Sequence, residues 1–294
     1  MTSDIARGLR VGSAASADGT EIGYCSLGEG PGLIIVGGVL SDGSTYLPLA
    51  QRLAGRFEVH LVDRRGRPRS GPQQSGHSIE HECADLIAVA EVTGATAVFG
   101  HSFGGLVALE TARRRPEFEL MYVYEPGVPV GGSFDFSWLD GYERLLQHGD
   151  RRGAFAWMVK HAGFAPRVLA AMPLWYVRAV LRLAVRGRRW QTMEPLLDAN
   201  LLEHRISAAL DAPTLHRFAA IRARTVLMGG TKSPGFISRQ LLAELGDVIP
   251  DSRLVLLPGL GHTAPADRPD AIVKTILAAA ASRSRTPAGA VQPR

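Results

Sequence analysis

The sequence has little cysteine, little lysine and no long hydrophobic run. Its 294 residues include two cysteines, Cys25 in an expected strand and Cys83 in an expected helix. We therefore expect two buried thiols rather than a disulfide or a metal site. No apolar run reaches the about 18 residues that a transmembrane helix requires. The N-terminal segment lacks the apolar core of a signal peptide, so we expect a cytoplasmic protein with no membrane partner.

Lysine supplies three of the 33 basic residues, which face 28 acidic ones for a net charge of +5. No basic block alternates with aromatic residues, so nucleic acid is not an expected partner. Arginines recur at helical spacing at Arg178, Arg182 and Arg186, and continue at Arg188 and Arg189. We interpret them as a solvated helix face, with docking of an acidic carrier protein or a coenzyme A thioester as the alternative. Nothing predicts a metal or a cofactor, and the oligomeric state stays open.

Strands and helices alternate along most of the chain, which predicts a parallel sheet with helices on both faces. The expected strands are 20–27, 32–38, 57–63, 95–99, 120–124, 225–228 and 254–257, and the expected helices 46–56, 80–92, 106–113, 237–245 and 271–281. Between them lies a stretch of helical period that contains all four tryptophans. We predict an α/β core domain from 1–130 and 213–281, a helical lid inserted at 131–212, and a disordered tail at 282–294.

The most informative stretch is Gly100-His101-Ser102-Phe103-Gly104, which joins an expected strand to an expected helix. A serine between two glycines at such a junction is typical of a nucleophile elbow. The turn is so tight that the residues two positions before and after the serine must lack side chains. Ser102 would then stand exposed at the carboxyl end of its strand, beside a helix N-terminus that favours negative charge.

A serine nucleophile needs a base, and His262 is the best candidate. It follows the last expected strand in Gly259-Leu260-Gly261-His262, so it should lie at the same sheet edge as Ser102. It also comes last in the chain, as the order serine, acid, histidine requires. His101 adjoins the serine but should point away from it, and we interpret it as a packing residue.

The acid that orients the histidine is less obvious. The usual position follows the strand 225–228, where Ser233 stands, and a hydroxyl cannot stabilise an imidazolium as a carboxylate does. Glu125 ends the strand 120–124, next to the nucleophile's strand, and is our choice. Asp247 and Asp251 are the alternatives, although they lie on the wrong side of the following helix.

Two backbone N–H groups are expected to stabilise an oxyanion. One belongs to Phe103, directly after the nucleophile, and the other to Val39, after the strand 32–38. Gly38 would let the backbone approach a bound carbonyl closely, and we expect it to contact substrate.

These motifs together resemble the α/β-hydrolase superfamily from about residue 18 to 281, the lid excepted. The resemblance rests on Gly37-Gly38, the segment 63–70, the elbow and the Gly259–His262 loop. It implies a doubly wound, mostly parallel sheet of eight strands. It also implies acyl transfer to Ser102, with the acid after the sixth strand as in some members. Two departures are Gly37, where a histidine often stands, and the missing acid after the seventh strand.

The sequence therefore predicts a serine hydrolase that acts on an ester, thioester or lactone of a bulky apolar small molecule. The lid aromatics Trp138, Trp157 and Trp175 are expected to line its pocket, unless they form the lid's own core. One alternative is a biosynthetic enzyme of secondary metabolism that cyclises or transfers the acyl group of a polyketide-like substrate. The other is a non-catalytic ligand-binding protein.

Overall fold

The structure is a computed structural model that describes residues 8–233 and 239–283. Its strands are β1 (Arg10–Ala15), β2 (Glu21–Leu27), β3 (Gly32–Val36), β4 (Glu58–Val62), β5 (Ala97–His101), β6 (Leu120–Tyr124), β7 (Arg224–Gly230) and β8 (Ser252–Leu257). Its α-helices are α1 (Leu47–Leu53), α2 (Ile79–Thr93), α3 (Phe103–Ala112), α4 (Leu139–Gln147), α5 (Arg151–His161), α6 (Arg167–Ala171), α7 (Leu174–Ala184), α8 (Arg188–Met193), α9 (Leu197–Ala209), α10 (Arg239–Val248), α11 (Ala264–Asp267) and α12 (Asp270–Arg283). Short 3₁₀ turns are η2 (Gly43–Tyr46), η3 (Glu194–Leu196) and η4 (His216–Ala220).

The strands form one eight-stranded sheet in the order β1-β2-β4-β3-β5-β6-β7-β8. The six strands from β4 to β8 run parallel, and β2 pairs antiparallel with both β1 and β4. This arrangement confirms the predicted mostly parallel, eight-stranded fold. The residue pattern alone missed β1, because this edge strand has little buried surface and its Val11 is 75% exposed.

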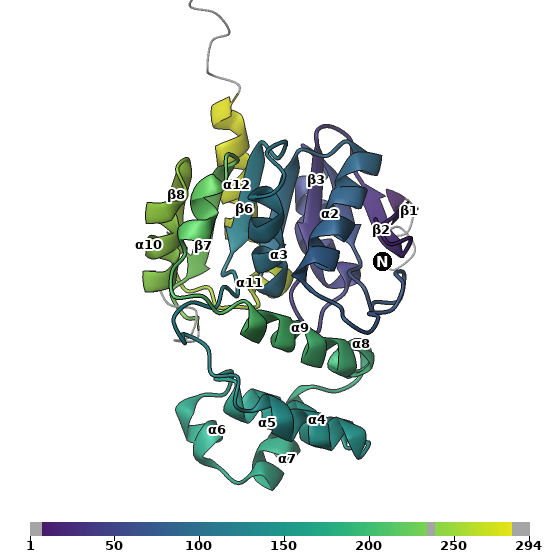
Figure 1. Cartoon of the computed structure of the whole chain (residues 1–294), viewed down its shortest axis with the longest axis vertical. Coiled ribbons are helices and arrows are strands. Elements are labelled where there is room, and N and C mark those ends of the chain that lie inside the picture. The colour runs from purple at the N-terminus through teal and green to yellow at the C-terminus, as the bar shows by residue number, and fades with distance from the viewer. Residues whose placement is uncertain (1–7, 234–238, 284–294) are drawn as a thin grey trace, which may run out of the picture.

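The sheet is covered on both faces, and alternate residues of each central strand point to opposite cores. Ile34 and Val36 of β3 pack in the core with α2, α3 and α10, whereas Leu33 and Ile35 pack in the core with α1 and α12. Figure 1 shows α2 and α3 in front of the sheet. Burial on both faces explains why these strands are continuous apolar runs. Cys25 and Cys83 are buried free thiols, as predicted.

Helices α4 to α9 lie between β6 and β7 in the chain, at one end of the sheet (Figure 1). The chain leaves and returns at one place, because Val130 and Ala212 form a β-bridge. The helices share an apolar core, which includes Trp138, Tyr142 and Phe155, and Leu40 from the loop after β3 packs into it. The segment 131–212 therefore contacts the loop that follows β3.

Several predicted boundaries differ from the structure near this end of the sheet. The strand predicted at 32–38 ends at Val36, so Gly37 and Gly38 lie in a loop. The helix predicted at 106–113 begins directly after the serine, at Phe103. Gly104 and Gly105 therefore lie in its first turn and do not prevent the helix from forming. The helix predicted at 46–56 covers Leu47–Leu53 after a 3₁₀ turn. The last helix continues two residues past 281, and the rest of the predicted tail lies outside the described residues.

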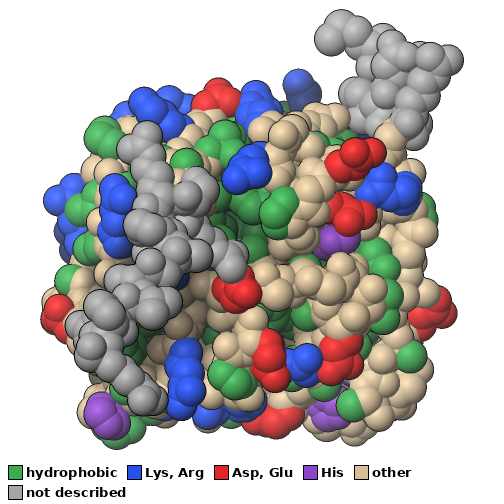
Figure 2. Space-filling view, turned by 90° about the horizontal axis from the view of Figure 1, so that it is seen from above, with side chains coloured by type: hydrophobic (Ala, Val, Ile, Leu, Met, Phe, Trp, Pro, Cys, Tyr) green, Lys and Arg blue, Asp and Glu red, His purple; other side chains and the backbone are tan. Residues whose placement is uncertain are grey.

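Within 8–233 and 239–283, no helix is both long and apolar enough to cross a bilayer. Charge is mixed on the face that Figure 2 shows, at the opposite end of the molecule from α4–α7. Basic and acidic side chains are interspersed there. The excess positive charge is thus not gathered on that face.

Candidate active site

Ser102 lies in a strained turn between β5 and α3. Its backbone has φ 55° and ψ −123°, which is unusual for a residue with a side chain. A Cβ at Gly100 would come within 2.7 Å of Gly104 O and Gly105 Cα, and one at Gly104 would collide with Val36 O. The glycines two positions on either side are therefore required by the close approach of backbone. The turn leaves Ser102 at the N-terminus of α3.

His262 connects Ser102 to Glu125. Its Nε2 lies 3.1 Å from Ser102 Oγ, and its Nδ1 lies 2.8 Å from Glu125 Oε2. An Nδ1–H that donates to the carboxylate leaves Nε2 as the acceptor for the serine hydroxyl. The loop before the histidine is held from both sides, because Lys232 N–H donates to Leu260 O at 2.8 Å and Tyr124 Oη–H donates to Gly261 O at 2.8 Å.

Glu125 is 1% exposed, and its second carboxylate oxygen is also bonded. Gly230 N–H donates to Oε1 at 2.6 Å, and the Ser233 hydroxyl donates to the same oxygen. Ser233 thus occupies the place after β7 where an acid was missing and binds the acid that comes from β6 instead. The alternatives Asp247 and Asp251 are exposed, and Asp251 lies at the start of β8, where it pairs with Arg224 at 3.5 Å.

His101 has more than the packing role that the sequence suggested. Its Nε2 lies 2.9 Å from the carbonyl oxygen of His262, and its Nδ1 lies 2.7 Å from Tyr46 Oη. A carbonyl only accepts, so Nε2 carries the proton and Nδ1 accepts from the tyrosine. Burial, with the nearby His262, holds the pKa of His101 well below its usual value, so the ring is neutral. The neutral ring therefore fixes the position of the His262 backbone.

Two N–H groups beside Ser102 are free. Within the described residues, nothing accepts a hydrogen bond from the N–H of Val39 or of Phe103. The neighbouring Gly38 N–H instead donates to Tyr46 Oη at 3.0 Å. A Cβ at Gly38 would lie 3.0 Å from Ser102 Cβ, so a glycine is needed for this approach. These are the two N–H groups predicted to stabilise an oxyanion, and that role stays a prediction.

A buried group of charges holds the Val39 peptide from behind. Arg64 Nη2 donates to Gly38 O at 3.0 Å, and its Nε donates to Gly37 O at 3.0 Å. Arg67 also donates to Gly38 O, at 3.3 Å. In a planar trans peptide the C=O and the N–H point in opposite directions. Pinning the Gly38 carbonyl therefore directs the Val39 N–H to the other side.

The two arginines are anchored by carboxylates from other elements. Glu203 of α9 pairs with Arg64 at 3.0 Å and with Arg67, and Glu82 of α2 pairs with Arg64 at 2.9 Å. Burial opposes ionisation of Glu203, but the positive charges of the arginines outweigh it and lower its pKa. This cluster was not predicted from the sequence, although the segment 63–70 includes both arginines.

Backbone strain is concentrated at this end of the sheet. Among the described residues, the non-glycine residues with positive φ are Leu40 at 53°, Ser102 at 55° and Glu125 at 46°. Ser102 and Glu125 both belong to the hydrogen-bonded series through His262, and Leu40 directly follows Val39. Such conformations persist only where the surroundings impose them, and they occur often at functional sites.

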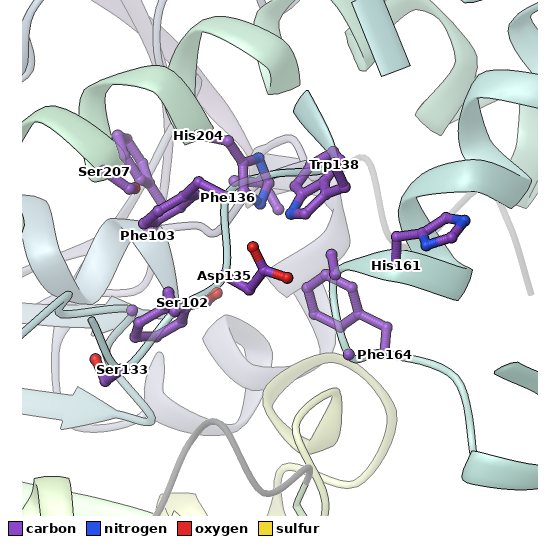
Figure 3. Close-up of a pocket in the computed structure, with 15 residues that line it drawn as sticks. Ser102, Phe103, Ser133, Asp135, Phe136, Trp138, His161, Phe164, His204 and Ser207 are labelled. Carbon is purple, nitrogen blue, oxygen red and sulfur yellow. The ribbon is translucent and has the colours of Figure 1, made fainter. Parts of the chain in front are cut away.

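Ser102 borders two cavities. The small cavity has a volume of about 250 Å³, and its lining includes Phe103, Asp135, Phe136, Trp138, Phe164 and His204 (Figure 3). The large cavity has a volume of about 630 Å³, and its lining includes Gly38, His101, Phe155, Met158, Arg189 and His262. Val39 and Phe164 border both. Side chains from the segment 131–212 thus contribute to the walls of each cavity.

The three tryptophans predicted to line the pocket differ in position. Trp138 lines the small cavity, whereas Trp157 and Trp175 line neither, so the prediction is wrong for those two. Trp157 lies behind Trp138, because its Nε1–H donates to Trp138 O at 2.9 Å and its ring packs against Gly141. Trp175 is 70% exposed on α7. Helical spacing could not distinguish the cavity face from the other faces of these helices.

Comparison with known proteins shows the family and the fold. Residues 33–275 match the sequence profile described as the alpha/beta hydrolase family. The chain belongs to that family. An alpha/beta hydrolase from Sphaerobacter thermophilus DSM 20745 has 31% sequence identity and a TM-score of 0.77, over 91% of this chain and 99% of that one.

Two other similarities are more limited. An enol-lactonase from Burkholderia xenovorans LB400 has 22% identity and a TM-score of 0.68, over 91% of this chain and 98% of that one, and so shares the fold. A pimeloyl-[acyl-carrier protein] methyl ester esterase from Xanthomonas campestris pv. campestris is 35% identical over 91 residues. That alignment covers 31% of this chain and 35% of the esterase.

Proposed function

We propose that this alpha/beta hydrolase cleaves an ester, thioester or lactone of a bulky apolar small molecule through an acyl-enzyme at Ser102. The observation that carries the proposal is the hydrogen-bonded series from Glu125 through His262 to Ser102, with separations of 2.8 and 3.1 Å. A serine whose base is oriented by a buried carboxylate has the arrangement that nucleophilic acyl transfer needs. The cavities beside the serine provide room for substrate.

In the first half-reaction, His262 Nε2 takes the proton of Ser102 as Oγ bonds to the carbonyl carbon. The carbonyl electrons move to oxygen, and the N–H groups of Phe103 and Val39 stabilise that oxyanion. As the carbonyl re-forms, the alcohol or thiol leaves and receives the proton from His262. Water then attacks the acyl-enzyme by the same route and releases the acid and Ser102. Glu125 stabilises the imidazolium in both steps.

The segment 131–212 acts as a lid in this proposal. Phe136, Trp138 and Phe164 from this segment cover the small cavity, and Phe155 and Met158, also from it, cover the large one. A predominantly apolar cover favours an apolar substrate and excludes water from charges that develop on the serine and histidine.

A thioester carried on coenzyme A or an acidic carrier protein is the second candidate substrate. Arg188 and Arg189 line the large cavity, and among the described residues neither has an acidic partner. Arg178, in contrast, pairs with Asp150 at 2.7 Å, as expected for a solvated helix face. An esterase that is similar over part of the chain is named for a substrate on an acyl-carrier protein, which supports recognition of a carrier, although the bond in that name is a methyl ester.

Labelling with a fluorophosphonate probe tests the proposal, because the probe reacts only with an activated serine. We expect the native protein to be labelled at Ser102 and to hydrolyse p-nitrophenyl esters. Ser102→Ala should abolish both, since it removes the nucleophile. Ser133→Ala, beside the small cavity, is the matched control and should still be labelled. A folded native protein that is neither labelled nor active would favour the non-catalytic ligand-binding alternative.

A further inference from the structure

The two cavities beside Ser102 differ in size, and His262 lines only the large one. We propose that the small cavity holds the acyl group and the large cavity holds the leaving alcohol. The preferred substrate is then an ester of a short acyl group with a large apolar alcohol. This inference rests on the proposed function and adds the direction in which the substrate lies.

The direction follows from the proton that the leaving group needs. His262 Nε2 is the acid in that step, and a general acid must come within hydrogen-bond distance of the oxygen it protonates. His262 and the following Thr263 and Ala266 line the large cavity. The leaving oxygen therefore faces that side. The acyl substituent, on the other side of the carbonyl carbon, points toward Phe103 and Gly127 in the small cavity.

The volumes limit what each side accepts. The large cavity, at about 630 Å³, is within the range of about 300 to 1,000 Å³ that is typical of small-molecule sites. The small cavity, at about 250 Å³, is below it. Phe134, Phe136 and Phe164 line the small cavity, and Figure 3 shows the last two, so bulky rings form part of its wall.

Polar groups on the small cavity act as acceptors. Asp135 projects into it in Figure 3, and hydrogen bonds from Ser137 lower the pKa of its carboxyl, which is therefore ionised. His204 Nδ1–H donates to Asn200 O at 2.9 Å, which leaves Nε2 as an acceptor. Burial lowers the pKa of His204, so the ring is neutral. An acyl group with a free carboxylate would be repelled here, whereas one with a hydroxyl would be accepted.

Two matched series of esters test the assignment. In one, acetate is joined to alcohols from methanol to decanol, and in the other, methanol is joined to acids of the same carbon numbers. We expect kcat/KM to rise by up to about fourfold per methylene in the first series, which is the gain from burying each group. In the second series it should fall once the acyl chain fills the small cavity. The methyl ester of a carrier-bound pimeloyl group, as named for the Xanthomonas esterase, should be a poor substrate.

One variant in each cavity distinguishes a directional site from a generally tight one. Phe136→Ala should extend the tolerated acyl chain, measured as a rise in kcat/KM for methyl decanoate relative to that for decyl acetate. Val159→Trp, in the large cavity, should reduce kcat/KM for decyl acetate at least tenfold relative to that for methyl acetate, and its remaining hydrolysis of methyl acetate shows that the variant folds. A native preference for long acyl methyl esters over long-chain acetates would overturn the inference while leaving the hydrolase intact. Absence of hydrolysis in both series together with absence of fluorophosphonate labelling would overturn the proposed function itself.

Discussion

At the scale of single residues, the site depends on a carboxylate and a hydroxyl at the ends of neighbouring strands. The carboxylate of Glu125 reaches His262 from the end of β6, and Ser233, after β7, donates to that carboxylate. The two strand ends are neighbours in the sheet, since β6 pairs with β7. A carboxylate from either strand could therefore reach the same imidazole.

We expect Glu125→Gln to lower kcat by about 10⁴-fold, because an amide cannot stabilise the imidazolium or select its tautomer. Steady-state hydrolysis of a p-nitrophenyl ester measures the loss. Ser233→Ala removes one hydrogen bond to the carboxylate and should cost far less.

The double variant Glu125→Ala with Ser233→Asp moves the carboxylate from the end of β6 to the loop after β7. We expect kcat of the double variant to exceed that of Glu125→Ala at least tenfold, measured with the same ester. Single Ser233→Asp should instead be impaired, since two carboxylates would share one site. Full activity in Glu125→Gln would mean that a different group orients His262.

At the scale of elements, α9 is coupled to the loop after β3. Glu203 of α9 pairs with Arg64 and Arg67, and both arginines donate to the Gly38 carbonyl. The peptide that carries the Val39 N–H is thus held through charges that originate in the segment 131–212. A buried pair of this kind contributes little net stability but imposes a defined geometry.

Arg64→Met should lower kcat by about 10²-fold with little change in KM, because the Val39 N–H matters most when the oxyanion forms. The affinity for a trifluoromethyl ketone, which mimics the tetrahedral adduct, should fall by a similar factor. Arg205→Met on α9, whose exposed arginine pairs with Glu143, is the control and should alter neither quantity. If Arg64→Met lowers only the melting temperature, the arginine has a structural role alone.

At the scale of the whole molecule, several histidines are buried in the neutral form. Burial lowers the pKa of His60, His101 and His204 below the value of about 6.5 in an unfolded chain. Below that value the unfolded chain binds more protons than the folded protein. Protonation therefore favours unfolding, and the stability is complete above about pH 6.5 and declines as the pH falls toward the lower folded pKa values.

We accordingly expect the melting temperature to be constant near neutral pH and to fall steadily between about pH 6.5 and 5. Thermal unfolding followed by circular dichroism across this range measures the slope. His60 lies on β4 away from Ser102, bonded to Ser26 at 2.8 Å, so His60→Gln should reduce the slope without changing activity at neutral pH. If the melting temperature of His60→Gln falls with pH as steeply as that of the native protein, groups other than His60 cause the loss of stability in acid.

The fold, and the proximity of Ser102 and Glu125 to His262, could be predicted from the sequence for a physical reason. Parallel strands buried on both faces are continuous apolar runs, and their carboxyl ends meet at one edge. Ser102, Glu125 and His262 each follow such a run, so their proximity could be inferred without coordinates. The elbow added a steric requirement for glycine that is visible in the chain itself.

Other features depended on contacts between distant segments. Arg64 and Glu203 are separated by 139 residues, and no periodicity relates them. The assignment of Trp138 to a cavity and of Trp157 and Trp175 to other positions depended on how α4, α5 and α7 pack. The sequence by itself determined the sheet and which strand ends carry the serine, the acid and the base, because local patterns specify local structure. Only the tertiary structure decided which groups hold the Val39 peptide and how two cavities divide the space beside Ser102, because packing between helices sets both.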